Sequence, residues 1–427
     1  MSQEYLPRLI DGVLPELMSA LPAIALGGAK GVGKTASAER VATTSLRLDA
    51  PAVRELVEAD ASHALSAPRP VLVDEWQRVP TLWDAVRRAV DDGAAPGSYL
   101  LTGSAYPRGA AIHSGAGRIV PLRMRPLSLA ERALVTPTVS LQALLRGGAP
   151  VTGSSPVSLV GYVGEIVGSG FPGIRTTSPV ARTHVLDSYI GNVIEREFPE
   201  QGLMVRAPAT LRRWLRAYAA ATSTTTSYQA ILEAATPGEP DKPAKKTTIA
   251  YRDVLHSLWL LDPVEAWVPD GHALGRLGQA PKHFLADPAL AVRLLDLTEA
   301  DLLMGAGDAI ATVAVLAARR PLLGRLFEAL VALSLQVYAD HLGARLRHLR
   351  TRNGDHEVDF IIEKGPAVVG IEVKLSSSVD DADLTHLRWL RERRGPLPTE
   401  LIVVTTGPTA YRRKDGIGVV PASLLGP

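Results

Sequence analysis

A short run near the N-terminal end, Gly28–Thr35, constrains the fold of this chain more than any other feature. It fits the pattern G-x-x-x-x-G-K-[ST] without a mismatch, and it lies between an apolar run at 23–28 and a helical pattern at 34–43. Glycines in such a run let backbone N–H groups turn inward around phosphate groups, and the start of the helix adds positive potential. The motif therefore predicts a phosphate-binding turn between a strand and a helix.

The residue types within this run assign separate roles. Gly28, Gly31 and Gly33 would form the backbone cradle. Lys34 would neutralise the β- and γ-phosphates of ATP, and the Thr35 hydroxyl would coordinate Mg2+. A chance glycine-rich turn is the alternative, but the strand and helix on either side favour the phosphate site.

A second apolar run, Val71–Asp74, ends in two adjacent carboxylates, Asp74 and Glu75, the pattern called Walker B. Asp74 would hold Mg2+ directly or through water, and Glu75 would orient and polarise the attacking water. The next predicted strand, 98–103, includes Thr102, which can sense the γ-phosphate, with a simple strand-end turn as the alternative. A solvated acidic turn is the alternative at Asp74. Together with the phosphate turn, these residues favour hydrolysis of ATP over binding alone.

The chain of 427 residues is long enough for two or three domains. Strands and helices alternate in its first third, which predicts an α/β domain with a parallel sheet covered by helices on both faces. Gly, Ser, Pro and Val dominate the next segment, which we interpret as a linker, with a packed irregular segment as the alternative. The expected division is an ATPase domain at 1–146, a linker at 147–181, a helical winged-helix-like region at 182–270, a helical connector at 271–320 and an α/β domain at 321–427.

Composition excludes several classes of protein. The chain has no cysteine, which rules out disulfides, thiolate zinc sites and a cysteine nucleophile. The segment before Pro22 carries charges at Glu4, Arg8, Asp11 and Glu16, so it has no signal-peptide core. The most apolar stretch, 310–318, is too short to span a bilayer. We therefore expect a cytoplasmic protein without membrane segments.

A second group of charged residues lies in the C-terminal part. Asp359 and the pair Glu372 and Lys374 fall in two alternating runs, 356–362 and 368–374. The period of two brings Glu372 and Lys374 to one face, within reach of Asp359. Such a group suits Mg2+-dependent phosphodiester hydrolysis, with the metal on Asp359 and Glu372 and with Lys374 positioning the water.

Glu328, on the preceding predicted helix, would complete the metal shell of this group. A strand edge that carries solvated charges is the alternative interpretation of all four residues.

Basic residues mark the helical middle of the chain. The run 211–221 predicts an amphipathic helix, and a second helical run spans 249–261. The basic residues on and before these runs are Arg212, Arg213, Arg216, Lys242, Lys245 and Lys246. Two helices separated by a turn, the second with a basic start, suit a helix-turn-helix or winged-helix DNA reader. A solvated basic surface is the alternative.

Several stretches resemble the prokaryotic AAA-type ATPases that carry a C-terminal helix-turn-helix-like and PD-(D/E)XK restriction-endonuclease-like region. The matching stretches are Tyr5–Arg8, Asp74–Gln77 with Pro80 and Leu82–Trp83, Leu101–Ser104, Ser114–Arg118, Pro126–Ser128 with Glu131, Gly324–Glu328 and Glu357–Phe360. The sequence departs from the family at Ala29-Lys30, where Pro-Arg is common, and at Val358, where the nuclease motif has proline. The resemblance implies that Arg118 stabilises the transition-state charge, in cis or from a neighbouring copy in a homo-oligomer. A structural salt bridge is the alternative role for this residue.

Two functions follow from these residues. One is an ATP-dependent enzyme that cuts DNA with its C-terminal site. The other is a regulatory or signalling ATPase whose nuclease-like domain binds DNA or protein without cutting. A small-molecule kinase is a third interpretation, and nothing in the C-terminal half favours it. ATP and Mg2+ are the expected cofactors, and DNA is the expected partner.

Overall fold

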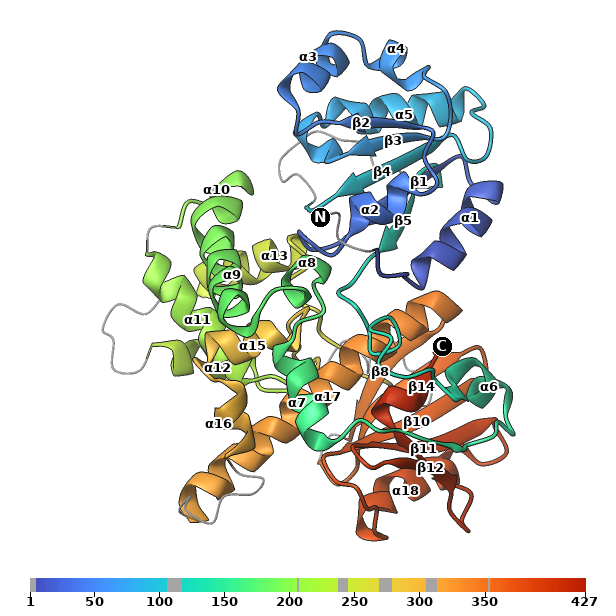
Figure 1. The fold of residues 1–427 in the computed structure, drawn as a ribbon, viewed down its shortest axis with the longest axis vertical. Helices are drawn as coiled ribbons and strands as arrows, with labels where there is room; N and C mark the ends of the chain where they lie inside the picture. The colour runs from blue at the N-terminus through green and yellow to red at the C-terminus, as the bar shows by residue number, and fades with distance from the viewer. Residues whose placement is uncertain are drawn as a thin grey trace.

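The computed structural model describes residues 5–105, 117–205, 207–236, 245–268, 279–304, 313–351 and 354–427. An N-terminal α/β unit, a helical middle region and a C-terminal α/β unit follow one another along the chain and lie in three separate parts of the molecule (Figure 1).

The N-terminal unit contains the expected parallel sheet. Its five strands have the order β2-β3-β4-β1-β5, and all neighbours are parallel. The strands are β1 Ala23–Gly27, β2 Thr44–Arg47, β3 Val71–Asp74, β4 Tyr99–Gly103 and β5 Val120–Arg123. The helices are α1 Ile10–Ala20, α2 Lys34–Glu39, α3 Pro51–Ala59, α4 Ala61–Leu65 and α5 Thr81–Asp91. Because the strands are parallel, their carboxyl ends meet at one edge, where the phosphate turn and the acidic pair lie.

Alternate side chains of these strands divide between two buried cores. Ile24, Leu72 and Leu100 pack on the face that α1 covers through Leu14. Val73, Leu101 and their neighbours pack on the opposite face, with α5. Both faces are apolar because a parallel sheet is covered on both sides.

The segment after β5 differs from the expected linker. It contains β6 Val139–Ser140, α6 Leu141–Arg146, β7 Gly153–Ser154, α7 Leu159–Val167 and α8 Pro172–Arg175. β6 is parallel to the last strand, β14 Leu425–Gly426, and β7 is antiparallel to β12 Thr409–Arg412. Short Gly- and Ser-rich stretches that read as a flexible linker thus have their backbone groups paired with C-terminal strands. Residues 139–154 therefore pack with the C-terminal unit.

The middle region is helical. Its elements are α9 Pro179–Asn192, the π-helical turn η2 Val193–Glu197, α10 Phe198–Glu200, α11 Pro208–Ala220, α12 Tyr228–Ala235, α13 Lys245–Ser257, α15 Pro288–Leu294 and α16 Glu299–Leu303. After α13 the chain forms antiparallel bridges between Leu261 and Leu285 and between Val264 and Lys282. We refer to residues 261–268 and 279–285 as the bridging hairpin. A parallel bridge from Ala266 to His348 attaches it to the C-terminal sheet.

The C-terminal unit is a mixed sheet in the order β7-β12-β13-β11-β10-β9-β8. Its further elements are α17 Val313–Leu342, β8 Arg345–Arg350, β9 Glu357–Lys364, β10 Ala367–Lys374, η3 Ala382–Leu384, α18 Thr385–Arg394, β11 Thr399–Thr405, β13 Gly418–Pro421 and η4 Ala422–Leu424. The two alternating runs named in the sequence, 356–362 and 368–374, correspond to β9 and β10, which are antiparallel neighbours.

The long helix α17 is strongly apolar. Its part Pro321–Leu342 has the length and composition of a membrane span, but 78% of that window is buried within the fold. Leu326, Phe327 and Leu330 belong to the largest core, which joins the middle region to the C-terminal sheet. This helix is apolar because it is buried among other elements of the protein.

Candidate functional site

The turn Gly28–Thr35 joins β1 to α2 at the carboxyl edge of the parallel sheet. Gly31 and Gly33 have φ angles of +83° and +100°, which a residue with a side chain rarely adopts. A Cβ atom on Gly28 would collide with the carbonyl oxygen of Met124. The glycines are therefore required by backbone shape and by close packing, as a phosphate cradle demands.

Lys34 begins α2 and is 5% exposed. Its ammonium donates to the carbonyl oxygens of Gly28 and Ala29 at 2.9 and 3.0 Å, within its own turn. Burial lowers the pKa of Lys34 to about 8, although the nearby carboxylates of Glu75 and Asp74 oppose that shift. The amine is thus held over the cradle, where a phosphate group would replace carbonyl oxygens as its partner.

Two hydroxyl groups converge on one oxygen of Asp74. Thr35 Oγ1 donates to Asp74 Oδ1 at 2.8 Å, and Thr102 Oγ1 donates to the same oxygen. β1, β3 and β4 bring these residues together, because β4 lies between the other two strands. The contact of Thr102 with Asp74 places it beside the predicted metal ligands.

Glu75 follows β3 in a left-handed conformation, with φ 59° and ψ 44°. That conformation is uncommon for a residue with a side chain and often marks a functional site. Gln77 Nε2 donates to Glu75 Oε2, and Ser104 Oγ lies 3.2 Å from the same oxygen. Neighbours thus orient this carboxylate at the strand edge.

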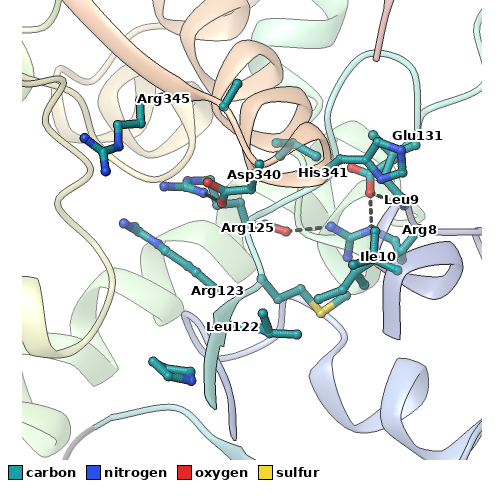
Figure 2. Close-up of a pocket in the computed structure, with 16 residues that line it drawn as sticks. Arg8, Leu9, Ile10, Leu122, Arg123, Arg125, Glu131, Asp340, His341 and Arg345 are labelled. Atoms are coloured by element: carbon teal, nitrogen blue, oxygen red, sulfur yellow. Dashed lines mark hydrogen bonds and ion pairs between the residues drawn. The ribbon is translucent and has the colours of Figure 1, made fainter. Parts of the chain in front are cut away.

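Arg8 contacts the backbone of the phosphate turn, a role that the sequence did not predict for this residue. Its guanidinium donates to Glu131 Oε1 at 3.0 Å, to Val32 O at 2.7 Å and to Arg125 O at 2.6 Å. Figure 2 shows Arg8 between Glu131 and Arg125 at the wall of a pocket. Arg8 and Glu131 both lie in the stretches that carried the family resemblance, and this buried pair is a physical reason for that match.

A cleft of about 450 Å³ opens beside the phosphate turn. Glu75, Gln77 and Ser104 line it from the N-terminal unit, and Glu197 and Glu200 line it from the middle region. The site is therefore shared between two parts of the chain.

Two contacts fix the middle region to the phosphate turn. Tyr189 donates its hydroxyl to the Lys30 carbonyl at 3.2 Å, and Glu197 lies 4.0 Å from the Lys30 ammonium. Burial raises the pKa of Glu197, so this carboxyl is more easily protonated than an exposed one. Sequence reasoning missed Tyr189 and Glu197, since no local motif connects them to the turn.

Arg118 lies away from this cleft, at the surface. Its Nε is 2.6 Å from Asp91 Oδ1 at the end of α5, and its side chain is 46% exposed. The stretch that precedes it, 114–116, lies outside the described residues. A role for Arg118 in stabilising transition-state charge stays a prediction.

The four charged residues predicted in the C-terminal unit do come together, but around a lysine that the sequence did not indicate. Lys282 Nζ lies 2.8 Å from Glu328 Oε1 and 3.0 Å from Asp359 Oδ1. Lys374 Nζ lies 3.5 Å from Glu372 Oε2. We refer to Lys282, Glu328, Asp359, Glu372 and Lys374 as the carboxylate centre.

The electrostatics of the carboxylate centre follow from its burial. Burial and the negative charge of Asp359 raise the pKa of Glu328 to about 8 and that of Glu372 well above its usual range. Within the described ranges, no three carboxylate or imidazole side chains are arranged to hold a metal ion. The predicted metal shell of Glu328, Asp359 and Glu372 therefore does not fit this geometry, because Lys282 already occupies the space between two of its ligands.

The predicted basic residues of the middle region have different positions. Arg212, Arg213 and Arg216 are exposed on α11, and Arg216 pairs with Asp296 at 2.7 Å. Lys246 is exposed at the start of α13, whereas Lys242 lies outside the described residues. An exposed basic face thus exists on α11, as predicted.

Comparison with known families agrees with the geometry of the N-terminal unit. Residues 21–133 match the family described as an AAA domain. The N-terminal unit is an AAA-type ATPase domain. Its match covers the phosphate turn, the acidic pair and Thr102, and it ends just beyond Glu131.

The other matches are to families and relatives whose roles are not described. Residues 163–301 and 323–425 each match a family described as a domain of unknown function, DUF8612 and DUF4143. Uncharacterized proteins of Mycobacterium tuberculosis and Mycobacterium bovis are each 26% identical over 361 residues, which cover 83% of this chain and 69% of theirs. A Walker-type ATPase of Pyrococcus abyssi has a solved structure with 15% identity and a TM-score of 0.41, covering 69% of this chain and 97% of that one.

The AAA domain fits ATP and Mg2+ on the basis of its own atoms. The glycine cradle has no room for a side chain at Gly28, and the Lys34 amine is directed at oxygen acceptors within it. Thr35 and Asp74 place a hydroxyl and a carboxylate side by side, the hard oxygen donors that Mg2+ prefers. Bound there, the ion would neutralise charge on the phosphate oxygens.

Nucleotide binding is expected to take up protons above about pH 8. Lys34 has a pKa of about 8 while its amine contacts neutral carbonyl oxygens, because burial outweighs the nearby carboxylates. Phosphate charge favours the protonated amine and raises this pKa, so binding above pH 8 draws a proton from solution. Calorimetric titration of ATP in two buffers of different ionisation enthalpy measures the uptake. The Lys34→Met variant is the control, and equal proton uptake by that variant would assign it to another group.

Proposed function

We propose that this chain is an ATP-driven regulator that acts on DNA. Mg2+-dependent hydrolysis in the AAA domain would change its contacts with the middle region, and the middle region would bind DNA. The observation that carries the proposal is the shared cleft, with Glu75 on one wall and Glu197 on the other. A nucleotide whose terminal phosphate changes would alter the charge between those two walls.

Each residue of the site has a part in hydrolysis. The backbone of Gly28–Thr35 binds the phosphates, and the Lys34 ammonium neutralises negative charge on their oxygens. Glu75 accepts the proton of the attacking water, oriented by Gln77 and Ser104. Asp74 holds the hydroxyls of Thr35 and Thr102 in place.

DNA binding by the middle region is supported by its order of elements. Three helices, α11, α12 and α13, are followed by the antiparallel bridging hairpin, an order similar to that of a winged helix. Exposed arginines on α11 supply the positive charge that phosphate contacts need.

For the C-terminal unit, the geometry favours binding of DNA or protein over cleavage of DNA. Cleavage by Mg2+ needs carboxylates that are free to take the ion, and Lys282 engages both Glu328 and Asp359. We therefore favour a regulatory ATPase that binds without cutting over an enzyme that cleaves DNA.

The test is ATP hydrolysis measured with and without single- and double-stranded DNA. DNA is expected to raise the rate, and an Arg212→Ala/Arg213→Ala variant is expected to lose that increase while its basal rate is unchanged. Lys34→Ala loses hydrogen bonds to charged phosphate, about 1.5–3 kcal/mol, or roughly ten- to a hundredfold in Kd for ATP.

Hydrolysis that no form of DNA alters would contradict the DNA part of the proposal. Cleavage of DNA by native protein with Mg2+, absent in Lys374→Ala, would restore the nuclease alternative.

A further inference from the structure

The carboxylate centre contains a cation of its own, contributed by the middle region. Lys282 is 1% exposed, and its ammonium contacts Glu328 Oε1 at 2.8 Å, Asp359 Oδ1 at 3.0 Å and Glu357 Oε1 at 3.6 Å. It also lies 5.5 Å from the centre of the Phe360 ring. Three carboxylates and an aromatic face thus surround one buried ammonium group, which is how proteins compensate a charge removed from water.

The backbone around Lys282 holds this ammonium in position. Lys282 and Val264 exchange two backbone hydrogen bonds of 2.9 Å. Two residues from Val264, Ala266 bridges to His348, and the backbone N–H of Trp267 donates to His348 O at 2.6 Å. The bridging hairpin is therefore attached to the edge of the C-terminal sheet beside β8. This backbone pairing fixes the position from which the Lys282 side chain enters the carboxylate centre.

A divalent ion would have to compete with this arrangement. Mg2+ requires about six oxygen ligands near 2.0–2.1 Å in an octahedron. Both oxygens of Asp359 are already engaged, one by Lys282 and one by the backbone N–H of Val373 at 3.0 Å. On the other side, Lys374 lies 3.5 Å from Glu372. An added ion would stand between two ammonium groups, and both would repel it.

We propose that Lys282 is the resident cation of the carboxylate centre. Its ammonium takes the place of a divalent ion between Glu328 and Asp359 and fixes the bridging hairpin to the C-terminal sheet. The centre then works as an ion-pair joint between two parts of the chain and needs no metal. Removing the lysine side chain uncovers a latent divalent-cation site.

The test is Mn2+ binding in the absence of nucleotide, followed by electron paramagnetic resonance and by thermal unfolding. Native protein is expected to leave Mn2+ free and to show no change in Tm. Lys282→Met is expected to unfold at lower temperature and to bind Mn2+ at least about tenfold more tightly than native protein, since changes around metal ligands alter affinity by about 10–100-fold. In Lys282→Met/Asp359→Asn, the gained binding is expected to be lost.

A second measurement covers the case in which Lys282→Met does not fold. Amine-reactive labelling of native protein, read by mass spectrometry, is expected to modify Lys30, whose side chain is 63% exposed, and to leave Lys282 unmodified with and without Mn2+. Mn2+ binding by native protein that Asp359→Asn abolishes, or labelling of Lys282 that Mn2+ induces, would overturn the proposal.

Discussion

Replacing Glu75 by glutamine is expected to leave ATP binding intact and to slow hydrolysis by about 10²–10⁴-fold, the usual contribution of a positioned general base. Glutamine keeps the size and the hydrogen-bonding reach of the side chain, so Gln77 and Ser104 can still hold it. What it loses is the ability to accept a proton from water. Rapid-quench measurement of phosphate release gives kcat, and equilibrium binding of a fluorescent ATP analogue gives Kd.

A matched control for Glu75 is available in the same cleft. Glu58 also lines the cleft but is not part of the strand edge with Asp74. Glu58→Gln removes one negative charge from the cleft, so its kcat is expected to stay within a few-fold of native. Equal loss in both variants would mean that cleft charge, and not proton transfer at Glu75, sets the rate. An unchanged kcat in Glu75→Gln would refute the role of Glu75.

The nucleotide site could be predicted from the sequence because its determinants are local. A phosphate turn needs glycines at fixed spacing, a lysine and a hydroxyl within eight residues, and the chain between Gly28 and Thr35 supplies them. The partner carboxylates of Asp74 and Glu75 were found because a parallel sheet brings strand ends to one edge. The two-residue period of a strand similarly predicted the shared face of Glu372 and Lys374.

Residues that act across long separations could not be found in this way. Lys282 lies 77 positions from Asp359, and Arg8 lies 123 from Glu131. No period or motif connects such pairs, because tertiary packing alone sets their distance. The sequence therefore indicated the carboxylates of the C-terminal unit but not the lysine that lies between Glu328 and Asp359.

The segment expected to be a linker, 147–181, contains a paired strand that its composition did not indicate, for a related reason. Glycine, serine and proline are typical of flexible connections. Here β7 within that segment pairs with β12, and β6 just before it pairs with β14. Composition cannot distinguish a free connection from a short edge strand, since the edge is completed by residues near the C-terminal end.

Replacing Asp262 by asparagine is expected to lower the free energy of unfolding by about 3–5 kcal/mol, the usual cost of leaving a buried charge unpaired. Asp262 is 3% exposed and accepts Arg123 at 2.7 Å and Arg125 at 2.6 Å. Burial alone would raise its pKa, but the two arginines outweigh burial and lower it. Its contribution is therefore complete above the unfolded pKa of about 3.9 and is lost as pH falls further.

Urea unfolding measures the loss, and Asp296→Asn is the matched control. That substitution removes a carboxylate whose pair with Arg216 is more than half exposed on both sides, so about 0–1 kcal/mol is expected.

Because Asp262 lies between the AAA domain and the rest of the chain, its loss is expected to have a second effect, on the cooperativity of unfolding. Arg123 ends β5 of the AAA domain, whereas Asp262 belongs to the bridging hairpin, and Arg125 also pairs with Asp340 on α17. The carboxylate thus joins the AAA domain to the rest of the chain, in addition to one large apolar core that includes Leu26 and Val32 of that domain. A second core, under α5, lies wholly within the AAA domain. Native protein and Asp262→Asn are therefore expected to differ in the number of calorimetric transitions, with the AAA domain unfolding separately in the variant. A single transition at lower temperature would instead show that Asp262 stabilises one cooperative unit.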